Sequence, residues 1–213
     1  MNGVYHTIFK KIKDIIFSLG NFVTSKSEVN EFFVSIGQLT IADDFLQVVN
    51  YPFEPSIAFT QSKFKVAQID DVDCKSCPPS FRVGSELIFL KAESKDELQN
   101  FAKKNDIMIV ERPIIWTWIL EPFLDMEFSQ ETDRKLMMLL NKYGLTTDQV
   151  MLLRDEVGSQ MIKYNFDTML WEWCGFDASD VLRAMRVKYN KVRFDDFYKR
   201  VMEIALLAEV SNL

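Results

Sequence analysis

Residues 129–164 read SQETDRKLMMLLNKYGLTTDQVMLLRDEVGSQMIKY, and apolar residues recur in this segment at intervals of three and four. This spacing places apolar side chains on one face of a helix. Ser129 is suited to cap a first helix, and Gly144 is suited to end it in a left-handed conformation. Thr146 and Gln149 have the spacing of a capping box that begins the next helix. The segment therefore predicts two consecutive amphipathic helices.

The sequence after residue 164 continues this pattern. Another helix is expected after Asp177 or Ser179, and a last one from about residue 194 to residue 210. Between residues 56 and 110, by contrast, short β-branched or aromatic runs alternate with turn residues, which is typical of strands. We therefore predict an α+β fold that is dominated by helices, with a small sheet within residues 56–110 and an all-helical C-terminal half.

Individual elements of the N-terminal half follow from the same signals. Residues 41–49 favour a short helix that stops ahead of Pro52. Strands are expected over residues 56–60, 63–69, 86–92 and 107–110, with a loop over 70–80, a helix that begins after Ser94, and further helices up to Leu19 and over 25–37. We treat residues 1–213 as a single domain that could be subdivided into a mixed α/β part, 1–128, and a helical part, 129–213.

Charge and composition exclude several classes of partner. The chain has 213 residues, a net charge of −6 and an isoelectric point near 5.0, so we expect no binding to nucleic-acid phosphates. The longest apolar runs fall far short of the roughly 20 residues that a membrane-spanning helix requires, so we expect no membrane span. The N-terminal amphipathic helix is expected to dock on the core rather than on a membrane, and a membrane-surface helix is the alternative. The N-terminus does not fit a secretory signal peptide, and the three cysteines are an odd number. We therefore expect a cytoplasmic protein.

Cys74 and Cys77 form a C-x-x-C motif, the spacing at which two thiolates share a zinc ion or exchange with a disulfide. A zinc site needs four ligands, and the other soft candidates, Cys174 and His6, are distant along the chain. Redox use is opposed by neighbouring aspartates, which raise the pKa of a thiol. Both cysteines could instead be structural thiols in a loop. Cys74 and Cys77 are the candidate metal ligands, zinc is the candidate cofactor, and no other cofactor is expected.

Residues 105–128 carry five acidic side chains against one arginine, beside two tryptophans. An acidic and aromatic segment suits a surface that binds another protein. Its carboxylates could also hold a hard cation, or the segment could be an acidic surface that its aromatic rings anchor to the core. A second tryptophan pair near residue 172 is a further candidate contact, because side chains two apart point to opposite faces of a helix. The predicted partner-binding residues are Trp116, Trp118, Glu121, Phe123, Asp125, Glu127, Trp171 and Trp173.

Residues 183–200 reverse the charge, with seven basic residues against two acidic ones, or three when the neighbouring Asp180 is counted. One interpretation is a small contact with phosphate or nucleic acid. The overall negative charge favours the other interpretation, a solvated helix face or a patch that pairs with the acidic segment 105–128. The sequence contains no phosphate-binding glycine loop, nucleophile elbow or dinucleotide fingerprint. We therefore predict no catalytic residue.

These patterns together predict a non-enzymatic cytoplasmic protein that binds a protein partner or associates with itself. An immunity-type or inhibitor-type protein is one concrete form of this hypothesis. The alternative hypothesis is a metal-binding or thiol-redox protein that uses the pair Cys74 and Cys77.

Overall fold

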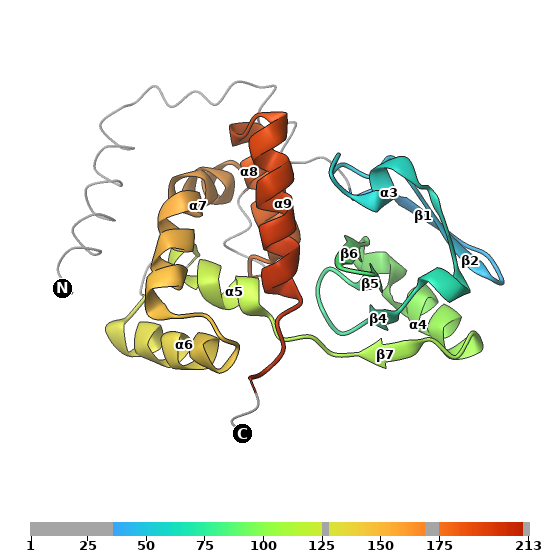
Figure 1. The fold of residues 1–213 in the computed structure, drawn as a ribbon, viewed down its shortest axis with the longest axis horizontal. Helices are drawn as coiled ribbons and strands as arrows, with labels where there is room; N and C mark the ends of the chain where they lie inside the picture. Colours follow the sequence, from blue (N-terminus) through green and yellow to red (C-terminus); the bar gives the residue numbers. More distant parts are fainter. Residues whose placement is uncertain (1–35, 125–127, 169–174, 211–213) are drawn as a thin grey trace.

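The computed structural model describes residues 36–124, 128–168 and 175–210 of the chain. Strands and one helix of moderate length form one end of the molecule, and a group of helices forms the other end (Figure 1). The predicted α+β fold is therefore confirmed, and beyond residue 129 the described residues contain helices and no strand, as predicted. The helices expected up to Leu19 and over residues 25–37 lie almost entirely outside the described residues.

The first sheet is antiparallel and has the strand order β1-β2-β3. Its strands are β1 (Gln38–Ile41), β2 (Phe45–Val49) and β3 (Lys63–Lys65). The prediction of a helix over residues 41–49 is wrong, and strands begin well before residue 56. Leu46 and Val48 explain the difference, because these buried residues alternate with more exposed neighbours, which is the period of a strand.

The segment between β2 and the second sheet also differs from the prediction. Residues 57–60 form a helical turn, α3 (Ile57–Thr60), rather than a strand. The hydroxyl oxygen of Ser56 accepts a hydrogen bond from the N–H of Ala58 and so caps this turn. The strand predicted over residues 63–69 is confirmed only as β3, because the chain continues as a 3₁₀ turn, η1 (Val66–Gln68).

The second sheet has the strand order β6-β5-β4-β7, in which only β4 and β7 run parallel. Its strands are β4 (Asp71–Asp73), β5 (Ser80–Val83), β6 (Glu86–Phe89) and β7 (Met108–Val110). The strand predicted at 107–110 is confirmed as β7, and the one predicted at 86–92 is confirmed as far as Phe89. The loop predicted over 70–80 contains β4. Asp71 and Asp73 suggest a loop in the sequence, whereas in the structure they are buried together with Val72.

A helical connection separates β6 from β7 along the chain. It consists of the 3₁₀ turn η2 (Ala92–Ser94) and the helix α4 (Lys95–Lys104). The helix begins after Ser94 as predicted, although the Ser94 side chain makes no capping hydrogen bond. α4 packs on β4 and β7, and β6 and β7 end up at opposite edges of the sheet rather than side by side.

The helical part follows β7 and confirms the predicted caps. The N–H of Thr132 donates to Oγ of Ser129, and Gly144 has a φ of 82°. Asp177 also caps its helix as predicted, whereas the last helix ends before the predicted residue 210. The elements are α5 (Ile115–Leu120), the 3₁₀ turn η3 (Glu121–Phe123), α6 (Gln130–Lys142), α7 (Thr147–Thr168), α8 (Ala178–Lys188) and α9 (Lys191–Ala205).

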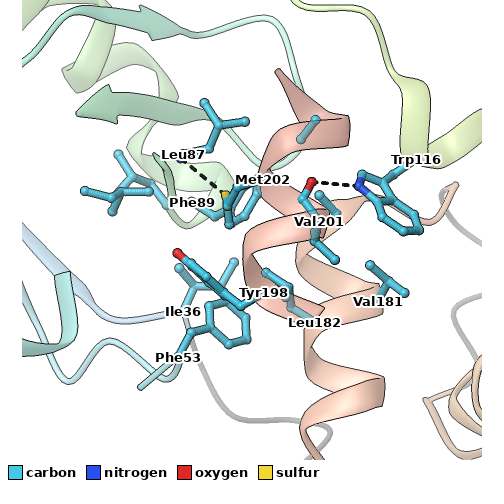
Figure 2. Packing of buried hydrophobic residues seen from close by; sticks show 14 of the residues in the cluster. Ile36, Phe53, Leu87, Phe89, Trp116, Val181, Leu182, Tyr198, Val201 and Met202 are labelled. Atoms are coloured by element: carbon cyan, nitrogen blue, oxygen red, sulfur yellow. Dashed lines mark hydrogen bonds between the residues drawn. The ribbon is translucent and has the colours of Figure 1, made fainter. Parts of the chain in front are cut away.

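Helix α9 joins the two ends of the molecule. On one side of α9, Met202 accepts a hydrogen bond from the N–H of Leu87 in β6, with 3.4 Å between nitrogen and Sδ (Figure 2). On the other side, Nε1 of Trp116 in α5 donates to the carbonyl oxygen of Val201 at 3.0 Å. A single cluster of buried apolar residues accordingly runs from the first sheet, through α9, to α7 and α8.

Glu86, the first residue of β6, ties α3 and α9 to the second sheet. Its Oε2 accepts hydrogen bonds from Oγ of Ser56 at 3.0 Å, from the N–H of Ile57 at 3.0 Å and from the hydroxyl of Tyr198 at 3.2 Å. Hydrogen bonds to an ionised carboxylate are stronger than those between neutral groups. One side chain therefore fixes both the first turn of α3 and the middle of α9.

Replacing Glu86 with alanine should lower the free energy of unfolding by about 2 kcal/mol or more, because partly buried donors lose their acceptor. Urea unfolding followed by circular dichroism measures this difference. The exposed Glu93 provides the control, since Glu93→Ala should change the stability by less than about 0.5 kcal/mol. Equal losses in the two variants would show that Glu86 has no such joining role.

Candidate functional site

The two outer edges of the second sheet differ. At the β6 edge, the N–H of Leu87 donates to Sδ of Met202, and the N–H of Phe89 donates to the hydroxyl of Tyr51 at 3.1 Å. These acceptors come from α9 and from the segment before α3. The outward N–H groups of β6 are therefore occupied by side chains, and this edge is closed to a further strand.

At the other edge, no strand among the described residues pairs with the outer side of β7. The N–H of Leu90 donates to the carbonyl oxygen of Pro79. This bond shows that the N–H and C=O groups of the even-numbered residues of β6 point toward β5. The N–H and C=O groups of successive residues in a strand point alternately to its two sides. When this alternation is followed through the registers from β6 to β4, the N–H and C=O of Val72 point toward β7. The same alternation directs the N–H and C=O of Ile109 away from the sheet, where an added strand would bind them.

The side chains at this edge are apolar and exposed. Met108 is 65% exposed, Ile109 is 39% exposed, and Ile114 just beyond the strand is 49% exposed. We call Met108–Val110 together with Ile114 the open edge. The other large apolar residues with high exposure, Phe59, Met138, Leu152, Val192 and Val210, occur one to an element or segment. Single exposed apolar residues are normal on protein surfaces, whereas three of them here lie between Met108 and Ile114, along and just beyond one sheet edge.

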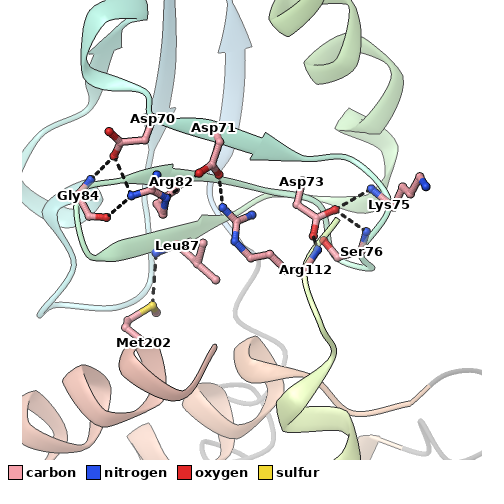
Figure 3. Close-up of polar contacts among 10 residues, drawn as sticks. All are labelled: Asp70, Asp71, Asp73, Lys75, Ser76, Arg82, Gly84, Leu87, Arg112 and Met202. Atoms are coloured by element: carbon pink, nitrogen blue, oxygen red, sulfur yellow. Dashed lines mark hydrogen bonds and ion pairs between the residues drawn. The ribbon is translucent and has the colours of Figure 1, made fainter. Parts of the chain in front are cut away.

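Buried charges hold the inner side of β7 in place. The carboxylate of Asp71 accepts from Nε of Arg82 at 2.7 Å and also pairs with Nη2 of Arg112 (Figure 3). Only 7% of the Asp71 side chain is exposed, so this contact is shielded from water. Because Arg112 follows β7 and Arg82 lies in β5, one carboxylate of β4 holds its two neighbours.

Asp73 fixes the chain on either side of the same strand pair. Its Oδ1 accepts from the N–H groups of Lys75 at 2.9 Å and Ser76 at 3.0 Å, and its Oδ2 accepts from the N–H of Arg112 at 3.0 Å. On the surface, Lys75 forms an ion pair with Glu111. These contacts order the loop after β4 and the residues after β7, and so hold the open edge in position.

One hollow lies beside these elements, and a second lies among the helices. The first, of about 80 Å³, lies between the second sheet and the helices and is lined in part by Asp73, Arg112 and Asp177. It has room for roughly two or three water molecules, which is less than a cofactor or a typical substrate needs. The second is a more open hollow of about 290 Å³ between α7 and α9, next to Leu152.

The C-x-x-C cysteines occupy different environments. Cys74 is 2% exposed, and burial together with the nearby Asp73 raises the pKa of its thiol. Cys77 is exposed, and both are free thiols. The part of the chain that the structure describes contains no group of three metal-binding side chains, while Cys174 and His6 lie outside it. The zinc and thiol-redox roles of Cys74 and Cys77 stay predictions.

The structure places Trp116 in the core rather than on a binding surface. It is 2% exposed, and its indole N–H donates to the carbonyl oxygen of Val201. The helix α5 turns this side chain inward, a direction that the sequence did not show. Trp118 is half-buried against Tyr143, with 5.5 Å between the ring centres. Trp116 is therefore withdrawn as a partner-binding residue.

The remaining predicted partner-binding residues divide into two groups. Glu121 and Phe123 are half-buried in η3, and the Phe123 ring lies so close to Gly158 that a methyl group there would be 2.8 Å from a ring carbon. Their roles stay predictions. Asp125, Glu127, Trp171 and Trp173 lie outside the described residues.

The basic stretch 183–200 is engaged within the chain. Arg183 pairs with Asp180 at 3.6 Å, Arg186 with Glu54 at 3.3 Å, and Arg200 with Glu156 at 2.8 Å. These partners lie outside the acidic segment 105–128, with which the patch was expected to pair if it was not a solvated helix face. The absence of nucleic-acid binding stays a prediction.

In the described ranges, no helix has the length and apolar character needed to cross a lipid bilayer. Comparison with protein families, with curated proteins and with solved structures found no match for this chain.

Alkylation should separate the two cysteines of the motif. Because a thiolate is the reacting form, the buried Cys74 should react with iodoacetamide at pH 8 at least about tenfold more slowly than Cys77 in the folded protein. Peptide mass spectrometry measures both rates in one sample. In urea the two rates should become similar, and equal rates in the folded protein would contradict the environment described for Cys74.

Asp71→Asn should lower the free energy of unfolding by about 3 kcal/mol, because two arginine side chains lose their buried counter-charge. Asp70→Asn is the matched control. The Asp70 side chain is 42% exposed, so its weak pair with Arg82 should contribute less than about 1 kcal/mol. Chemical unfolding of both variants measures the difference, and similar losses would contradict the role given to Asp71.

Proposed function

We propose that this chain is a non-enzymatic cytoplasmic protein that binds another protein through the open edge of β7. The observation that carries the proposal is the contrast between the two edges of one sheet. Tyr51 and Met202 close the β6 edge, whereas Ile109 presents outward backbone groups at the β7 edge. Proteins generally protect exposed sheet edges, and an edge left open with apolar side chains is suited to strand addition.

The rigid support behind the edge favours binding over local unfolding. Asp71 and Asp73 fix the residues that flank β7, so a partner strand would meet a backbone already in the paired conformation. The entropy lost when these residues become ordered is already lost on folding, so it does not weaken association. The free thiols Cys74 and Cys77 are in keeping with the reducing compartment that the proposal assumes.

The free energy of association determines how many residues the contact must include. Each net backbone hydrogen bond contributes about 1 kcal/mol, and full burial of Met108 or Ile114 contributes roughly 2 kcal/mol each. Association itself costs at least about 4 kcal/mol in lost translational and rotational freedom. A strand as short as β7 therefore binds stably only if the partner also covers Ile114. An immunity-type or inhibitor-type protein is one concrete form of this function.

A photoreactive amino acid at Met108 should cross-link to a bound protein when the full chain is irradiated in its native cells. The control carries the same amino acid at Val192, which is 74% exposed on α9. We expect a discrete cross-linked product at Met108 that is at least about tenfold weaker at Val192, because only the open edge contacts the partner. Mass spectrometry identifies the product. The same product at both positions, or none at Met108, would contradict the proposal.

A further inference from the structure

We propose that the partner at the open edge is a second copy of this chain, which pairs β7 with β7 in antiparallel orientation about a twofold axis at Ile109. This inference rests on the proposed function, because it requires that the open edge binds a protein. It adds the identity of the partner, the orientation of the added strand and its register. The result would be one continuous sheet with four strands from each copy.

The backbone limits which residues can pair. Asp106 has a φ of 53°, so the chain leaves the extended conformation just before the strand, and the N–H of Ile107 is already donated to the carbonyl oxygen of Ala102 at 2.9 Å. Pro113 has no N–H to donate. Between these limits lies β7, and Ile109 is its middle residue. In an antiparallel pair centred on it, the N–H of each Ile109 donates to the C=O of the other.

The side chains favour the same register. With the axis at Ile109, the two Ile109 side chains lie opposite each other and Met108 lies opposite Val110 of the second copy, so only apolar residues meet in the centre. An axis at Val110 would set Ile109 against Glu111. An axis at Glu111 would oppose two like charges, which destabilises a strand pair.

Charges at the ends of the strand are compatible with this arrangement. Antiparallel pairing brings the end of β7 that carries Glu111 and Arg112 toward the end of the other β7 that follows the exposed Lys103, Lys104 and Asp106, so charges of both signs meet there. Lys75 neutralises Glu111 within its own chain, so no net repulsion builds up across the axis. A parallel pair would instead align like ends.

The closed edge of the sheet explains why pairing would stop at two copies. The β6 strand of each copy is covered by Tyr51 and Met202, so the enlarged sheet offers no further strand position at its ends. A contact between identical surfaces about a twofold axis is closed, unlike a head-to-tail contact that continues into a filament. Because β7 has only three residues, the expected dimer is weak and depends on concentration.

Disulfide trapping tests the register directly. In the full chain with Cys77→Ser, Ile109→Cys should form a covalent dimer under mild oxidation, because opposed Cα atoms about 5.5 Å apart are within disulfide range. Glu111→Cys is the matched control. It lies on the same face of β7 and is exposed, but in this register its two copies are displaced from each other by four residues. We expect at least about tenfold slower dimer formation for Glu111→Cys.

Sedimentation velocity supplies the second measurement, on the unmodified chain and on Ile109→Lys. The unmodified chain should form dimers as its concentration rises, and Ile109→Lys should remain monomeric while retaining its circular dichroism spectrum. Monomers at every concentration, with equal trapping rates for the two cysteine variants, would overturn the inference. If Ile109→Cys forms no disulfide-linked dimer but the cross-linker at Met108 captures a different protein, the result supports the proposed function and contradicts only the pairing of two copies.

Discussion

The burial of two aspartates on one short strand is the constraint on which the second sheet depends. A carboxylate that leaves water must find partners, and Asp71 finds them in Arg82 and Arg112. Asp73 satisfies its oxygens with backbone N–H groups, including that of Arg112. The same contacts attach β5 on one side of β4 and the chain after β7 on the other. Because α5 begins three residues after Arg112, they also set where the helical part starts.

The arrangement around α9 then determines which edge of the sheet is available for binding. Packing α9 on β6 brings Met202 to the N–H of Leu87, and the segment before α3 brings Tyr51 to the N–H of Phe89. The edge near the helices is thereby closed. The edge at β7 lies away from α9 in Figure 1 and keeps its outward backbone and its apolar side chains. The proposed binding surface is thus the part of the sheet that the joining helix does not reach.

The sequence predicted helices well where the apolar pattern and the residues suited to helix ends indicate the same element. Ser129, Gly144 and Asp177 stand at helix ends with side chains or backbone freedom suited to those positions, and each acts there as expected. It failed where short elements owe their conformation to distant partners. The aspartates of β4 indicate a loop by local preference. Arginines 11 and 41 positions away allow Asp71 to lie in a strand, and backbone N–H groups, including that of the distant Arg112, do the same for Asp73.

By itself, the sequence determined the α+β class, the caps and extents of most helices after residue 129, and the strands at β6 and β7, because these depend on residues close together in the chain. Only the tertiary structure decided that Trp116 is a core residue and that β6 and β7 lie at opposite edges. It also decided that Ile109 faces outward. Strand order and burial depend on contacts between segments far apart in the sequence, and a local pattern does not specify which segments will meet.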